Sequence, residues 1–189
     1  IDGTKVEDLI QGEIDGRKQV MSLSKFFMNH VPGFEDAYLA GVGCQIGIRE
    51  SRHIVGEYTL TGDDVVHGRK FEDVIARGYF PIDIHHVDGR AGYDEAGGSW
   101  LGLEDSYDIP FRCLVPKTFD GLLVAGRAIS ATHEAHGSLR TQGGVMAIGQ
   151  AAGTAAGLCA LKDRAPRTLH VGDLQNHLIK EGASLHRDF

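Results

Sequence analysis

The stretch Gly121-Leu-Leu-Val-Ala-Gly126-Arg127-Ala-Ile-Ser-Ala-Thr-His133-Glu134-Ala-His136-Gly-Ser-Leu-Arg140-Thr141-Gln142-Gly143-Gly144 decides the fold class of this 189-residue chain. A short apolar strand is expected over residues 122–125, followed by a polar loop and then a long helix that opens at about Gln142 to Gly144. This order of elements is how an α/β sheet presents a phosphate group to the amides of a helix N-terminus. The stretch therefore predicts one half of a nucleotide site.

The helix expected over residues 141–161 is dominated by glycine and alanine. Gly149, Gly153 and Gly157 recur at every fourth residue and form one smooth face. The run approaches the ~20 apolar residues that cross a bilayer, but polar residues interrupt it. We therefore expect a buried helix packed tightly against a sheet, and no association with a membrane.

The apolar pattern elsewhere predicts further helices. Residues 5–30 have helical spacing broken near two glycines, which fits one interrupted helix or two helices. Residues 71–77 are expected to form one or two helical turns, and residues 171–181 an amphipathic helix that ends at Gly182. Thr61, followed three residues later by Asp64, predicts a capped helix start.

Strand patterns and a glycine-rich segment complete the outline. Strands are expected over residues 46–50, 53–60 and 109–115. Residues 89–102 contain five glycines and few core residues, so they predict a loop between two subregions. We therefore expect one domain over residues 1–102 and a second over residues 103–189.

Composition narrows the classes of partner and cofactor. Acidic residues outnumber basic ones by 26 to 19, the net charge is −7 and no basic run occurs, which argues against nucleic acid or an anionic membrane as a partner. Cys44, Cys113 and Cys159 lack C-x-x-C spacing, so we expect neither a disulfide framework nor a zinc or iron–sulfur site. A cytoplasmic location is favoured.

The opening stretch, together with Tyr107-Asp-Ile-Pro-Phe-Arg-Cys-Leu-Val-Pro116, closely resembles the C-terminal half of bacterial FAD-dependent oxidoreductases of the glutathione-reductase-like superfamily. The narrower similarity is to members that end in LLVAGR, ISATHEA and GQAAGTAA. A second block, residues 47–61 followed by 80–85, is similar to the cap region of that group. The resemblance implies an α/β fold, with residues 103–189 as the C-terminal part of a three-layer FAD/NAD(P)-binding domain with a mixed sheet, and residues 1–102 as an α+β cap segment. It also implies FAD as the cofactor and hydride transfer from a small-molecule substrate.

The chain lacks one motif that the resemblance would lead us to expect. Such enzymes begin with a G-x-G-x-x-G turn that holds the ADP half of FAD, whereas Gly41-Val-Gly43-Cys-Gln-Ile46 has isoleucine at the third glycine site. The chain also starts at Ile1, so we expect a C-terminal piece whose partner is the missing N-terminal half of the same protein. A sheet edge left open in this way can pair with other chains, including a second copy in a homodimer.

The resemblance assigns cofactor contacts to the opening stretch. A reduced flavin gains negative charge at its N1/C2 carbonyl edge, which the positive end of a helix dipole stabilises. Gly143 and Gly144 let backbone amides approach the ring; alternatively, they only ease packing of the turn. The expected cofactor-binding residues are Gly126, Arg127, His133, Arg140, Thr141, Gln142, Gly143 and Gly144.

Three residues are candidates for taking a proton from the substrate: His133, Glu134 and His85. Histidine titrates near neutrality, and desolvation can raise the pKa of a glutamate toward it; a purely structural role of the loop is as plausible for His133 and Glu134. His133 and His136 are three residues apart rather than four, so they do not fit the H-E-x-x-H zinc pattern and no metal is expected.

Arg49 and Arg52 are candidates for binding a substrate carboxylate, with an internal ion-pair network as the alternative. Two other functions stay open for the chain as a whole. One is a non-catalytic interaction or scaffold module that keeps a remnant of the fold, and the other is a metal-dependent hydrolase built on the histidine-rich segments.

Overall fold

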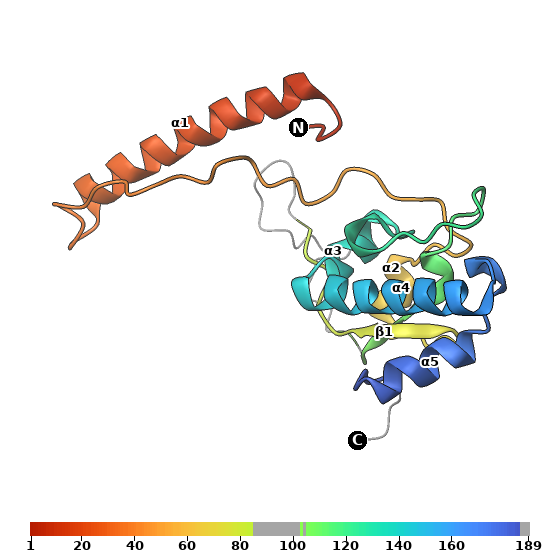
Figure 1. The fold of residues 1–189 in the computed structure, drawn as a ribbon. Helices are drawn as coiled ribbons and strands as arrows, with labels where there is room; N and C mark the ends of the chain where they lie inside the picture. The colour runs from red at the N-terminus through yellow and green to blue at the C-terminus, as the bar shows by residue number, and fades with distance from the viewer. Residues whose placement is uncertain (85–102, 104, 186–189) are drawn as a thin grey trace. The chain divides into compact units, whose positions relative to one another are not determined.

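The computed structural model describes residues 1–84, 103 and 105–185 (Figure 1). The chain forms two compact units, Ile1–Arg52 and His53–Phe189. The loop expected over residues 89–102, with the domain boundary at its end, lies outside the described residues. Strands β1 (Val74–Gly78) and β2 (Tyr107–Pro110), which lie on either side of that position, pair in one sheet. A cap over residues 1–102 and a cofactor domain over 103–189 remain a prediction.

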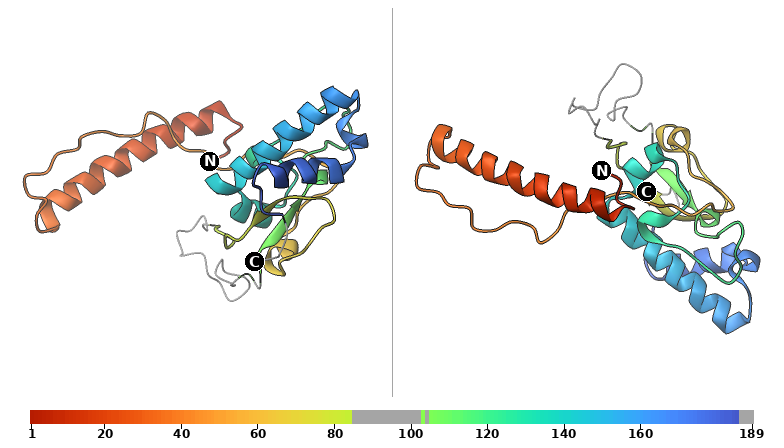
Figure 2. Two further views of the ribbon diagram at one scale, coloured as in Figure 1. Left: turned by 60° about the horizontal axis from the view of Figure 1, so that its bottom comes forward. Right: turned by 90° about the horizontal axis from the view of Figure 1, so that it is seen from above.

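The first unit is a single long helix, α1 (Val6–His30), followed by an extended chain that runs back beside it (Figure 2). Gly12 does not interrupt the helix; an added Cβ there would lie 2.8 Å from both the Ile1 and Ile46 side chains. Glu13 accepts a hydrogen bond from the Ile46 backbone N–H. The strand expected over 46–50 is wrong: this extended chain is held by α1 and not by a sheet ladder.

The second unit contains an antiparallel ribbon of β1 and β2. The helix expected over 71–77 is wrong, because Val74 to Gly78 extend and pair with β2. Gly78 has to be glycine, since an added Cβ would lie 2.3 Å from the Tyr107 ring. The strand expected over 109–115 ends at Pro110, where the chain turns into the 3-10 helix η1 (Phe111–Cys113).

Helices α4 (Gln142–Lys162) and α5 (Val171–Lys180) pack against β1 and against each other (Figure 1). The face of α4 that is buried carries Ile148, Ala151, Ala155 and Leu158. The helix packs against β1 as expected, but not through its glycine face: at Gly149, Gly153 and Gly157 an added Cβ would meet open space. Alanine and branched side chains, not glycines, supply the apolar area that drives packing.

By length and composition, α4 is the one helix in the described part of the chain that is apolar enough to cross a membrane. These two properties are weak evidence, because the core helix of a water-soluble protein passes the same test. Along a groove of about 770 Å³, the open side of α4 faces residues 121–125 and 163–166.

Short elements complete the second unit. Helix α2 (Gly62–Val66) begins with the expected Thr61/Asp64 capping box, in which each side chain bonds the other residue's backbone N–H. After the 3-10 helix η3 (Pro166–Thr168), α5 is amphipathic as expected and buries Leu174 and Leu178, whereas Ile179, expected on the same face, is exposed. Gly182 follows the end of α5 with φ +91°, the left-handed conformation that glycine adopts without strain.

Candidate functional site at the start of α4

Residues 121–144 comprise an extended segment, two short helices and the first turn of α4, rather than a strand followed by a loop. The strand expected over 122–125 is wrong: the segment is extended, and Val124 donates a backbone hydrogen bond to Leu114 O at 2.9 Å, but the described residues contain no strand paired with it. The 3-10 helix η2 (Gly126–Ala128) follows, with Gly126 at φ +72°. Helix α3 (His133–Leu139) then replaces the expected polar loop and leads into α4.

Thr132 is the N-cap of α3, and its hydroxyl accepts a hydrogen bond from the Ala135 backbone N–H at 3.4 Å. His133 and Glu134 occupy the exposed first turn. A hydrogen bond from its own backbone N–H, followed by one from the Thr132 hydroxyl, holds the pKa of Glu134 below its usual value. Desolvation raises this pKa less than the hydrogen bonds lower it, so Glu134 is a carboxylate at neutral pH.

The two glycines at the junction of α3 and α4, Gly143 and Gly144, have different surroundings. At Gly144 an added Cβ would lie 2.8 Å from Leu139 O, so this glycine is needed for the close approach of the two helices. At Gly143 an added Cβ would meet nothing within 4 Å, and the residue is exposed. The packing explanation thus fits Gly144, whereas Gly143 leaves the backbone open to a ligand.

Arg140 and Thr141 make the turn between the helices. The Arg140 guanidinium donates from Nη2 to Asp83 O at 2.7 Å, which joins α3 to residues 83–84. Thr141 is the N-cap of α4, and its side chain makes no capping hydrogen bond. The first backbone N–H groups of a helix have no acceptor within the helix, so the start of α4 offers donors toward solvent.

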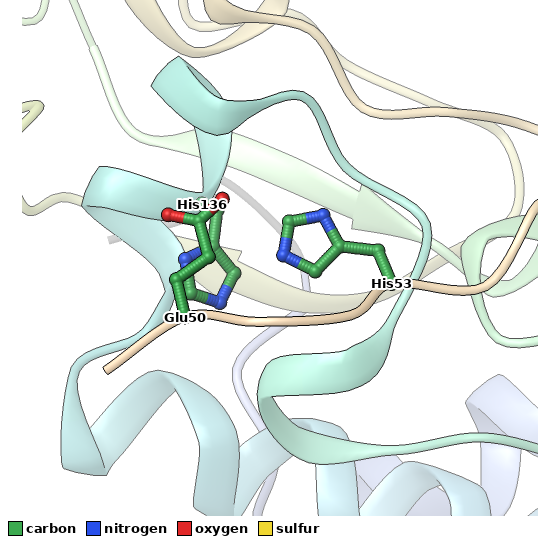
Figure 3. A group of neighbouring side chains, drawn as sticks. All are labelled: Glu50, His53 and His136. Carbon is green, nitrogen blue, oxygen red and sulfur yellow. The ribbon is translucent and has the colours of Figure 1, made fainter. Parts of the chain in front are cut away.

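The structure brings together a pair of histidines that the sequence does not predict to be neighbours. The His53 and His136 rings stack with centroids 4.6 Å apart and planes at 29° (Figure 3). His53 Nδ1 lies 3.0 Å from Ala131 O, and His136 Nε2 lies 3.0 Å from Arg127 O. The sequence marks His136 only as a possible metal ligand, and no local pattern marks His53, because the two residues meet only in the folded chain.

In a comparison with known protein families, residues 1–178 match the FAD dependent oxidoreductase family. The chain belongs to this family. FAD is the family's cofactor, as the sequence resemblance implied, and flavin-dependent oxidation is the activity that the family indicates. Comparisons with curated proteins and with solved structures each gave no match.

The remaining residues expected at the site of this oxidoreductase lie in different parts of the chain. Gln142 is the exposed first residue of α4, and Arg127 is exposed in η2. Arg49 and Arg52 are exposed in the first unit, Ile1–Arg52. His85 lies outside the described residues.

The residues present fit the flavin end of FAD better than its ADP end. The start of α4, with open Gly143 beside Arg140, presents backbone donors and a cation. Gly41 and Gly43 instead lie in the chain that runs beside α1, with no strand or helix over residues 31–52. A strand–turn–helix that would hold a pyrophosphate is therefore not formed there.

Proposed function

We propose that this chain is the C-terminal, flavin-facing part of an FAD-dependent oxidoreductase of the glutathione-reductase-like superfamily, with a three-layer cofactor domain that removes a hydride from a small-molecule substrate. The observation that carries the proposal is the start of α4, where Gly143 leaves the backbone open. FAD, when bound, supplies the hydride acceptor. Residues of the chain itself would stabilise charge on the flavin, accept the substrate proton and bind the substrate.

The start of α4 would stabilise negative charge at the N1/C2 edge of the flavin. The helix has 21 residues, so its dipole is well developed, and the Thr141 side chain leaves the first amides uncapped. Arg140 adds a guanidinium at the same turn, held in place by the Asp83 carbonyl. Gly126, Arg127 and His133 would contact the cofactor from the preceding turns.

The proton lost by the substrate would go to a group near the start of α3. The Glu134 carboxylate is ionised and the His133 imidazole can accept a proton, and both are exposed. His85 is the further candidate for this role. Arg49 and Arg52 would bind a substrate carboxylate.

The ADP half of FAD needs a partner in this proposal. We assign it to the N-terminal half of the same protein, because Gly41 and Gly43 do not lie in a dinucleotide turn. A homodimer is the second arrangement that could complete the site. We expect the assembled enzyme to act in the cytoplasm.

The test is retention of FAD by the assembled protein, in which this chain is paired with the N-terminal half, after gel filtration. Retention is read from the visible spectrum and compared in a matched pair of variants. Gly143→Leu should abolish retention, because the side chain would cover the amides at the start of α4. Gly153→Leu is the control: it also points into open space, ~15 Å further along the same helix. Equal retention by both variants would remove the start of α4 from the site, and no flavin bound by the wild type would favour the scaffold alternative.

A further inference from the structure

The segment Gly126–Thr132, here named the cofactor loop, is held through its carbonyl groups. Ala128 O accepts a hydrogen bond from Ile54 N at 3.0 Å, and Ser130 O accepts one from Leu60 N at 3.1 Å. These two donors are backbone groups, which any residue except proline supplies. The carbonyls of Arg127 and Ala131 are held instead by imidazole side chains.

The two imidazoles that hold these carbonyls are His136 and His53. Because a carbonyl oxygen can only accept, the proton must lie on Nε2 of His136 and on Nδ1 of His53. The rings stack at 4.6 Å, so each also limits how the other can turn. His136 is fully buried and comes from α3, whereas His53 begins the second unit, so the pair joins distant parts of the chain to one loop.

We propose that His53 and His136 are positioning residues for FAD, acting through the cofactor loop. This inference rests on the proposed function, in which Gly126 and Arg127 contact the cofactor and the loop leads directly into His133. With both carbonyls held, the backbone at Arg127 has one orientation, and α3 begins at a set place beside it. Without the imidazole donors, the loop keeps its hydrogen bonds to backbone N–H groups but loses the two hydrogen bonds that the histidine side chains make to Arg127 O and Ala131 O.

Two kinds of variant test this proposal: one keeps a hydrogen-bond donor but replaces the imidazole ring, and the other removes the donor. Gln at 136 places an amide nitrogen near the position of Nε2, and Asn at 53 places one near Nδ1, whereas Leu at either position removes the donor. We expect His136→Leu and His53→Leu to weaken FAD binding about tenfold in a fluorescence titration, and His136→Gln and His53→Asn to stay within about twofold of wild type. His177→Leu is the control, since His177 is exposed on α5 and bonds only its own helix through Nδ1.

A second measurement needs no flavin. Hydrogen exchange at the Ser130 and Thr132 amides, which bond Cys113 O and Leu60 O, should be faster in the two Leu variants than in wild type and should be restored in the Gln and Asn variants. A third needs no variant: nitrogen-15 NMR of the wild-type chain should show the Nδ1–H tautomer for His53 and the Nε2–H tautomer for His136.

The outcomes separate this inference from the proposed function. If the wild type retains no FAD, the proposed function fails, and hydrogen exchange and the tautomers still decide the present inference. If the wild type binds FAD but the Leu and Gln variants of His136 exchange and bind alike, the donor has no positioning role. An Nε2–H tautomer at His53 would also overturn the inference.

Discussion

The hydroxyl oxygens of Tyr107 and Ser138 lie 2.7 Å apart in the core and join β2 to α3. Ser138 donates its own proton to Phe80 O, so Tyr107 is the donor in this pair. Both side chains are almost completely buried. The sheet and the helix that carries His133, Glu134 and His136 are therefore connected by a chain of hydrogen bonds.

We expect Tyr107→Phe to lower the free energy of unfolding by about 1 kcal/mol, because it removes one hydrogen bond and leaves Ser138 still able to donate. Ser138→Ala should cost more, about 1–3 kcal/mol, since it strands the buried Tyr107 hydroxyl and the Phe80 carbonyl. Urea unfolding measures both, with the exposed Tyr79→Phe as control. A smaller loss for Ser138→Ala than for Tyr107→Phe would contradict the assigned direction.

Stability should fall on the alkaline side. Burial raises the pKa of Tyr107 from 10.0 to about 12, and burial raises the pKa of Cys113 from 9.0 to about 12. Because both folded-state pKa values exceed the unfolded ones, the stabilisation is complete below pH 9 and is lost as pH rises to 12.

For Tyr107 alone, the loss between pH 10 and 12 amounts to about 3 kcal/mol. The free energy of unfolding, measured from pH 8 to 12, should therefore decline less steeply in Tyr107→Phe than in wild type. Alkaline curves of equal slope would show that Tyr107 ionises as easily in the folded chain as in the unfolded one.

Asp64 should have the opposite dependence on pH. Burial would raise the pKa of this carboxyl, but hydrogen bonds from the Thr61 backbone, the Tyr58 hydroxyl and Arg69 outweigh it and lower the pKa. A lowered folded-state pKa gives stability that is present above the unfolded value of about 3.9 and is lost as pH falls through the folded value.

Asp64→Asn should therefore cost about 1–3 kcal/mol at pH 7, with the difference from wild type shrinking in acid. The neighbouring Asp63→Asn is the control, because Asp63 is exposed on the same helix. Thermal unfolding at pH 7 and pH 3 measures the effect. A difference that persists unchanged at pH 3 would mean that the cost comes from packing and not from charge.

The two glycines at the start of α4 should respond differently to alanine. Gly144→Ala should destabilise the chain, because its methyl group would lie 2.8 Å from a backbone oxygen that has little freedom to move, Leu139 O. Gly143→Ala should stabilise it by up to about 1 kcal/mol, since a helix favours alanine and the site is open. Denaturant midpoints of the two variants decide this, and a shift of the same sign in both would contradict the geometry.

Local chemistry made several elements predictable from the sequence. The Thr61/Asp64 box begins α2, and Gly182 ends α5, because caps depend on residues close together in the chain. The long glycine–alanine helix starts where expected, at Gln142. The motif from Gly121 to Gly157 was also specific enough to indicate the family that the comparison of residues 1–178 shows.

Features that depend on distant partners were not predictable. The apolar run over 122–125 is not a strand, because a strand exists only where a second one pairs with it, and residues 74–78 became a strand because β2 lies alongside them. Which face of α4 is buried was decided by what packs there, β1 and α5.

By itself, then, the sequence determined the family, the cofactor and the helices whose signals are local. Tertiary structure alone decided that Gly143 is open while Gly144 is packed, and that His136 meets His53 and the carbonyl of Arg127. The physical reason is range: propensity and capping act within a few residues, whereas steric room and hydrogen-bond partners at a site come from segments that only folding brings together.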